Sequence, residues 1–143
     1  MMLTIFLKNQ RSHLGLVSHK ALILAVEYGH IMITQFLLHH DKIDPTFNNN
    51  EALQIAVKHN HVAIVHSMLR KHTIDPSANF NEAIRYASSN GYRFIVKILL
   101  KDSRVDPSAM NNEAIYNASK NGHKDIVFLL LKDPRVSSTI SLP

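Results

Sequence analysis

Ten histidines are the residues of this chain whose chemistry first suggests a site, because neutral imidazole is the commonest metal ligand in proteins. Two close pairs occur, His39–His40 and His59–His61, but no Asp or Glu recurs beside either pair to supply a third ligand. Three histidines recur at one position of a repeated segment: His30, His61 and His123. A recurrent position favours a structural role over ligation. We therefore predict no metal site and no cofactor.

Catalytic motifs are also missing from the sequence. It contains no cysteine, no Gly-rich phosphate loop, no nucleophile elbow and no His-Glu-x-x-His. The carboxylates that recur, in Asp-Pro and Asn-Glu pairs, have turn and helix-cap explanations and do not form an acid–base pair. We predict that the protein is not an enzyme.

The elements that position these side chains belong to a repeat. Residues 106–136 read DPSAMNNEAIYNASKNGHKDIVFLLLKDPRV and match residues 75–105 at 20 of 31 positions without a gap. The same register extends back to Asp44-Pro45 and to Gly29-His30. Self-similarity at such a period indicates a stacked array, with a thin core and local contacts.

Each repeat predicts two short helices joined by a corner. In the third repeat, Ala83, Ile84 and Ala87 form one apolar face, and Asn81 stands one step before it, where we expect an N-cap. The equivalent asparagines are Asn50 and Asn112. The first helix should end at a corner residue that tolerates a left-handed backbone: Gly29, Asn60, Gly91 or Gly122. A second apolar helix follows, and Asp-Pro then starts a turn.

This pattern resembles the ankyrin repeat family. The motifs that carry the resemblance are Ala-Ile-x-x-Ala-x-x-Asn-Gly-His at 114–123 and Ile-Val-x-Leu-Leu-Leu at 126–131, with counterparts in all four units. The usual period is about 33 residues, whereas this chain has 31. Glu-Ala replaces the family's Thr-Pro, and Asn replaces the glycine of its finger. We therefore expect shorter or differently shaped fingers between the helix pairs.

The expected architecture is an all-α, ankyrin-like helix-turn-helix solenoid that forms a single domain over residues 1–143. Its predicted parts are an N-terminal capping half-repeat at 1–18, repeats at 19–43, 44–74, 75–105 and 106–136, and a tail at 137–143. Phe128 lies where other repeats carry polar residues, so we expect the tail, a partner or a second copy to cover it. Tail packing is favoured, since Ile140 and Leu142 are otherwise unexplained.

The charge balance leaves two interpretations open. The net charge is +5, and repeat-equivalent residues His39, Arg70, Lys101 and Lys132 form a basic column. The adjoining column is His40, Lys71, Asp102 and Asp133. One interpretation is complementation of helix dipoles and solubility; the other is contact with RNA, DNA or an acidic protein. No signal peptide or membrane span is visible. We expect a soluble, monomeric protein inside the cell, in the cytoplasm, without membrane association.

The resemblance implies a non-enzymatic protein-interaction module that binds its partner on a concave face formed by turns and first helices. The positions that vary between repeats on this face are the candidate binding residues: Tyr28, Phe47, Lys58, His59, Phe80, Arg85, Met110 and Tyr116. Alternatives are a polyanion- or nucleic-acid-binding basic surface, and a piece of a larger repeat scaffold. The sequence does not name the partner.

Overall fold

The computed structural model describes residues 18–140, and within them every regular element is a helix. Residues 18–27 are helical. The later helices are α2 (Ile31–Leu38), α3 (Phe47–Lys58), α4 (Val62–Leu69), α5 (Ala78–Ser89), α6 (Arg93–Leu100), α7 (Ala109–Lys120), α8 (Lys124–Leu131) and α9 (Pro134–Ser137).

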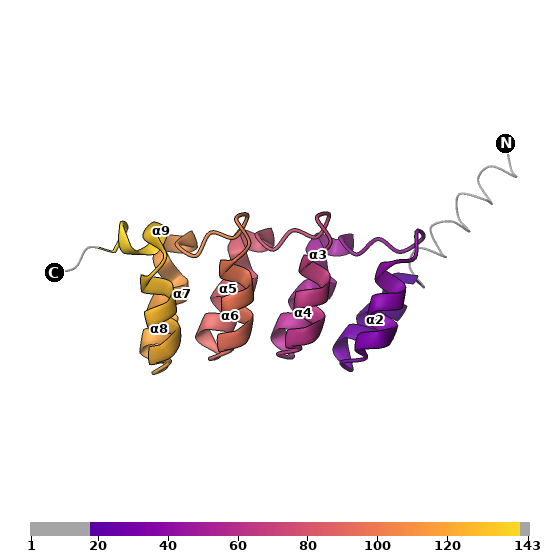
Figure 1. The fold of residues 1–143 in the computed structure, drawn as a ribbon, viewed down its shortest axis with the longest axis horizontal. Helices are drawn as coiled ribbons and strands as arrows, with labels where there is room; N and C mark the ends of the chain where they lie inside the picture. The colour runs from indigo at the N-terminus through magenta and orange to yellow at the C-terminus, as the bar shows by residue number, and fades with distance from the viewer. Residues whose placement is uncertain (1–17, 141–143) are drawn as a thin grey trace, which may run out of the picture.

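The helices form two layers of a stack that runs along the long axis of the molecule (Figure 1). In one layer α3 contacts α5 and α5 contacts α7; in the other, α2, α4, α6 and α8 contact one another in order. Each helix of the first layer also packs on the helix that follows it. The predicted all-α helix-turn-helix solenoid is therefore confirmed. The repeat limits stay a proposal, and the predicted capping half-repeat lies outside the described residues except for residue 18.

The core is the thin ribbon that the repeat predicts. In the third helix pair, Ala83, Ile84 and Ala87 on α5 are fully buried, as are Ile95 and Val96 on α6. The small alanine side chains let α5 approach its neighbours closely. A third buried row follows the second helices, at the ends of the turns: Ile74, Val105 and Val136. Each such aliphatic side chain contributes about 1.5–3 kcal/mol through burial.

The corner after each first helix has the predicted left-handed backbone, with φ of +72° at Gly29, +55° at Asn60, +77° at Gly91 and +80° at Gly122. At Gly91 a steric contact, in addition to the left-handed backbone, requires glycine. A Cβ there would lie 2.8 Å from Cε1 of His123, whose Nε2 is 3.1 Å from the carbonyl oxygen of Ser89. Likewise, a Cβ at Gly29 would lie 2.9 Å from Cε1 of His61, and Nε2 of His61 is 3.0 Å from the carbonyl oxygen of Glu27. These two recurrent histidines therefore join successive repeats, which confirms their structural role.

The predicted N-cap role of Asn50, Asn81 and Asn112 is wrong. All three side chains are buried, and none accepts a hydrogen bond from its own helix. Instead, the backbone N–H of Asp75 donates to Asn50 Oδ1 at 2.9 Å, and that of Asp106 donates to Asn81 Oδ1 at 2.7 Å. The recurrent asparagine thus joins each repeat to the next one. The physical reason is that its own backbone is left-handed, which directs the side chain away from its helix.

Residues 134–140 pack on the last helix pair but leave Phe128 exposed. The contact of Asn112 differs from those of Asn50 and Asn81: its Nδ2 donates to Thr139 Oγ1 at 2.9 Å. Ile140 packs against the core. Phe128 nevertheless remains 61% exposed, with Nζ of Lys132 4.4 Å from its ring centroid. Residues 137–140 of the predicted tail therefore do not cover Phe128, contrary to expectation; the remaining tail residues, including Leu142, lie outside the described residues.

Candidate binding surface

Each of α3, α5 and α7 contains a left-handed segment near its start, after the Asp-Pro turn and before the right-handed part of the helix, and we call this segment the finger. The fingers are residues 48–50, 79–81 and 110–112, and all nine residues have φ between +51° and +63°. Their ψ values of 32–52° make each finger one turn of left-handed helix. No strand occurs in residues 18–140, so these fingers are not β-hairpins. This confirms the expectation of an altered finger shape.

The fingers tolerate this left-handed backbone mainly because most of their residues are asparagine, but two of them are not. Seven of the nine finger residues are Asn, which visits the left-handed region more readily than other side chains. The exceptions are Phe80, with φ of +56°, and Met110, with φ of +55°. A left-handed conformation costs an ordinary L-residue about 1–2 kcal/mol. Phe80 and Met110 are therefore strained positions.

Neither side chain recovers this cost by packing. Phe80 is 75% exposed and Met110 is 54% exposed. Each could have curled back onto the adjacent turn, and the exposure shows that neither does. Two apolar side chains thus project into solvent from neighbouring fingers. Tyr116, on α7 in the same layer, is 57% exposed.

Arg85 holds the Phe80 finger in place. Its Nε donates to the carbonyl oxygen of Phe80 at 3.0 Å, and Nη2 donates to that of Asn79 at 3.2 Å. Its Nη1 forms an ion pair with Glu113 Oε2 on α7 at 2.7 Å. The guanidinium is therefore occupied within the chain. Its place in the predicted binding set stays a prediction, and its visible role is to position Phe80.

The first and second fingers are also joined directly. Asn49 Nδ2 donates to Asn79 Oδ1 at 2.9 Å. Within the first of these fingers, Asn48 Nδ2 donates to Glu51 Oε2 at 3.1 Å. That hydrogen bond, followed by one from His19, holds the pKa of Glu51 below its ordinary value of 4.5. The first two fingers are therefore linked through their asparagine side chains.

The remaining predicted residues fall into two groups. Phe47 precedes the first finger, where its ring lies 4.1 Å from that of His19. Tyr28, Lys58 and His59 lie at the other end of the first helices, about 12 Å away for a helix of eight residues. Lys58 Nζ forms an ion pair with Glu82 at 3.3 Å. The structure therefore brings Phe80, Met110 and Tyr116 to the finger side and places Tyr28, Lys58 and His59 at the corner side.

A hollow of about 320 Å³ lies between α5 and α7, from the fingers towards the corners. Seven residues line it: Glu82, Arg85, Tyr86, Ser89, Asn90, Glu113 and Asn117. Of this set, the candidate binding residues chosen from the sequence include only Arg85, although Ser89 and Asn90 are also positions that vary between repeats. Their arrangement around one hollow depends on how neighbouring first helices pack. The lining offers hydrogen-bonding groups from both helices.

Other kinds of site were sought in the same part of the chain. Among residues 18–140, His, Asp and Glu side chains do not gather in threes that could hold a metal ion. None of the described helices has both the length and the apolar composition that crossing a membrane requires.

Comparison with known proteins gave one match. A family model described as ankyrin repeats, in three copies, matches residues 2–80, which is more than half of the chain. Comparison with curated proteins gave no match, and neither did comparison with solved structures.

Proposed function

Because the chain belongs to the ankyrin repeat family, whose members are generally protein-interaction modules, we propose that it is a non-enzymatic module that binds a protein partner through its fingers and first helices. The partner would contact the finger side of the surface, centred on Phe80, Met110 and Tyr116. We further propose that the chain is monomeric when the partner is absent.

The observation that carries this proposal is the strain at Phe80 and Met110. Asparagine occupies the equivalent positions in the other fingers, as Asn49 and Asn111 for Phe80, and Asn48 and Asn79 for Met110. Asn would therefore fold at least as well there. Strained residues persist where their surroundings hold them and are typical of functional sites. Exposed Phe, Met and Tyr side chains are also those enriched in the cores of interfaces.

The chemistry of the surroundings suits a protein partner. The hollow between α5 and α7 extends from Arg85, which contacts the Phe80 finger, to Ser89 and Asn90 at the corner end, and it would offer hydrogen-bonding groups to a partner that also contacts Phe80. An apolar centre with a polar rim is the usual anatomy of a protein interface. The occupied guanidinium of Arg85 keeps the Phe80 finger rigid, which lowers the entropy cost of binding.

The test is affinity measured against a partner captured from a lysate of the source cell and then purified. Phe80→Ala and Tyr116→Ala should each weaken binding by about 1–3 kcal/mol, because exposed aromatic residues at an interface centre are typical hot spots. Phe94→Ala is the matched control, since Phe94 is an aromatic residue that is 64% exposed but lies on α6 in the other layer.

The result expected is loss of affinity in the first two variants and an unchanged affinity in the third, with similar melting temperatures throughout. If Phe94→Ala weakens binding and Phe80→Ala does not, the partner binds the second-helix layer and the proposed surface is wrong.

A further inference from the structure

A second surface lies on the other layer, near the C-terminal ends of α2 and α4. A hollow of about 570 Å³ opens there between the two helices. Six residues line it: Gln35, His39, Ser67, Arg70, Lys71 and His72. Every one of them carries a hydrogen-bond donor or a protonatable nitrogen, and none carries a carboxylate. We call this hollow the basic hollow.

The positive charges of the basic hollow are not neutralised within the described part of the chain. Arg70 and Lys71 form no ion pair with any residue between 18 and 140, whereas Arg85, Arg104 and Arg135 each pair with a nearby carboxylate. Arg70 stands at the C-cap of α4, where a cation complements the helix dipole. Complementation of the helix dipole therefore explains the charge of Arg70. It does not explain the charge of Lys71, the next residue in the chain.

The two later repeats show what the fold itself favours at the position of Lys71. There the residue is an aspartate, Asp102 or Asp133, and the arginine two residues later binds it through two nitrogens. Arg104 also donates to the carbonyl oxygens of His72 and Ile74 in the preceding turn. This clamp satisfies charges and joins repeats. The second repeat has Lys71 and Thr73 instead, so it gives up a stabilising clamp and places an unpaired cation beside the hollow.

We infer that the basic hollow binds an acidic segment of a partner protein, at a surface separate from the fingers. Carboxylate groups of the segment would accept hydrogen bonds from Arg70 and Lys71, with Ser67, Gln35 and the histidines completing the set of donors. Charge-assisted hydrogen bonds of this kind are stronger than neutral ones. Because the hollow is open to solvent, the positive charges of Arg70 and Lys71 would attract the acidic segment as it approaches.

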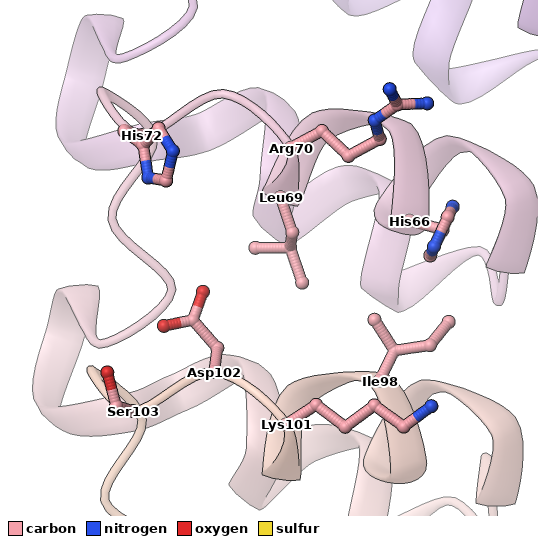
Figure 2. A pocket seen from close by; sticks show the side chains of 8 residues that line it. All are labelled: His66, Leu69, Arg70, His72, Ile98, Lys101, Asp102 and Ser103. Atoms are coloured by element: carbon pink, nitrogen blue, oxygen red, sulfur yellow. The ribbon is translucent and has the colours of Figure 1, made fainter.

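An adjoining hollow of about 370 Å³ favours a peptide over a nucleic acid (Figure 2). It shares Arg70 and His72 with the basic hollow and continues towards α6. Leu69 and Ile98 point towards one another across it, and Lys101 lies at its edge (Figure 2). Its only carboxylate, Asp102, is held by Arg104 at 2.6 Å. A peptide side chain can use this apolar floor, whereas neither lining contains an aromatic residue of the Phe, Tyr or Trp type on which bases stack.

The experiment compares three labelled probes on the full chain: a peptide of repeated Glu-Glu-Leu triplets, its Gln-Gln-Leu counterpart, and oligothymidylate of equal length. The variant Arg70→Gln/Lys71→Gln should bind the acidic peptide roughly tenfold more weakly, because each of the two solvent-accessible charges contributes a modest amount. Lys71→Gln alone, which leaves the helix cap intact, should show part of this loss. The control Lys120→Gln/Lys124→Gln removes the same net charge from exposed positions elsewhere.

The inference is supported if the wild-type chain prefers the Glu peptide over both other probes and only the Arg70 and Lys71 variants lose binding. Equal losses in the control show that net charge alone drives the binding, and they overturn the inference. Tighter binding of oligothymidylate overturns it in favour of nucleic acid. A folded wild-type chain that binds no probe also overturns it. The result for Phe80→Ala is independent, because that variant leaves this layer unchanged.

Discussion

At Phe80 an aromatic side chain occupies a left-handed backbone and points into solvent, so the residue contributes strain without burial. Met110 does the same one finger further on. The apolar character of both residues at finger positions is visible in the sequence. The strain is not, because the sequence alone places these residues in an ordinary turn. Three successive left-handed residues are unusual, and only the backbone angles reveal why asparagine is so common there.

Two features require glycine at a corner, a left-handed backbone and a close histidine ring; Gly91 has both, whereas Gly122 has only the first. Gly91→Ala should destabilise the fold by about 2–3 kcal/mol, because a left-handed alanine is strained and its Cβ would contact the His123 ring. Gly122→Ala should cost only about 1 kcal/mol, since no heavy atom lies within 4 Å of its Cβ position. Denaturant unfolding of both variants measures the difference. Equal losses would mean that His123 moves aside freely and has no part in the requirement for glycine.

At the scale of the helix and its turn, the buried asparagine of each finger is the main joint between repeats. Its recurrence is plain in the sequence, but the sequence reading assigned it to the wrong partner. An asparagine before a helix usually caps that helix, and only the left-handed finger turns Asn81 towards Asp106 instead. The helix pairs themselves were predictable, because their apolar spacing and corner residues are local features.

Asn81→Ala should destabilise the chain by about 2–3 kcal/mol. The change leaves the N–H of Asp106 without its acceptor and places alanine in a left-handed conformation. Asn111→Ala is the matched control: it has the same kind of backbone, but its side chain is exposed, so about 1 kcal/mol is expected. Thermal unfolding of the two variants gives the comparison. A loss at Asn111 as large as that at Asn81 would contradict the inter-repeat role.

The Asp–Arg clamps of the last two turns predict a pH dependence. Hydrogen bonds from Arg104 hold the pKa of Asp102 below its ordinary value of 3.8, and Arg135 acts on the pKa of Asp133 in the same way. A lowered folded-state pKa contributes stability that is present above pH 3.8 and is lost as the pH falls through the folded-state value. Asp102→Asn should therefore cost about 1 kcal/mol at neutral pH, discounted for partial exposure.

The cost of Asp102→Asn should shrink as the pH falls below 3.8, because wild-type Asp102 then becomes neutral as well. Urea unfolding at a series of pH values measures it. Asp41→Asn serves as the control, since Asp41 is exposed and pairs with no cation in residues 18–140. A cost that is independent of pH would show that the clamp acts by shape and not by charge.

At the scale of the whole molecule, the stack presents different chemistry on its two layers. The finger side exposes apolar side chains beside a polar hollow between α5 and α7, and the second-helix layer is basic near the ends of α2 and α4. The sequence predicted the stack, because four units keep one register. It could not predict the two hollows, because each is formed by side chains of neighbouring repeats whose packing is set by the completed array.

The most direct test of the protein-binding proposal is the double variant Phe80→Asn/Met110→Asn, measured for stability and for affinity to the purified partner. Asparagine relieves the left-handed strain, so the free energy of unfolding should rise by about 1–2 kcal/mol. Affinity should fall at least tenfold, because the two apolar contacts are removed. Opposite changes in stability and affinity would show that both residues are retained for binding. An unchanged affinity in the stabilised variant would contradict the account.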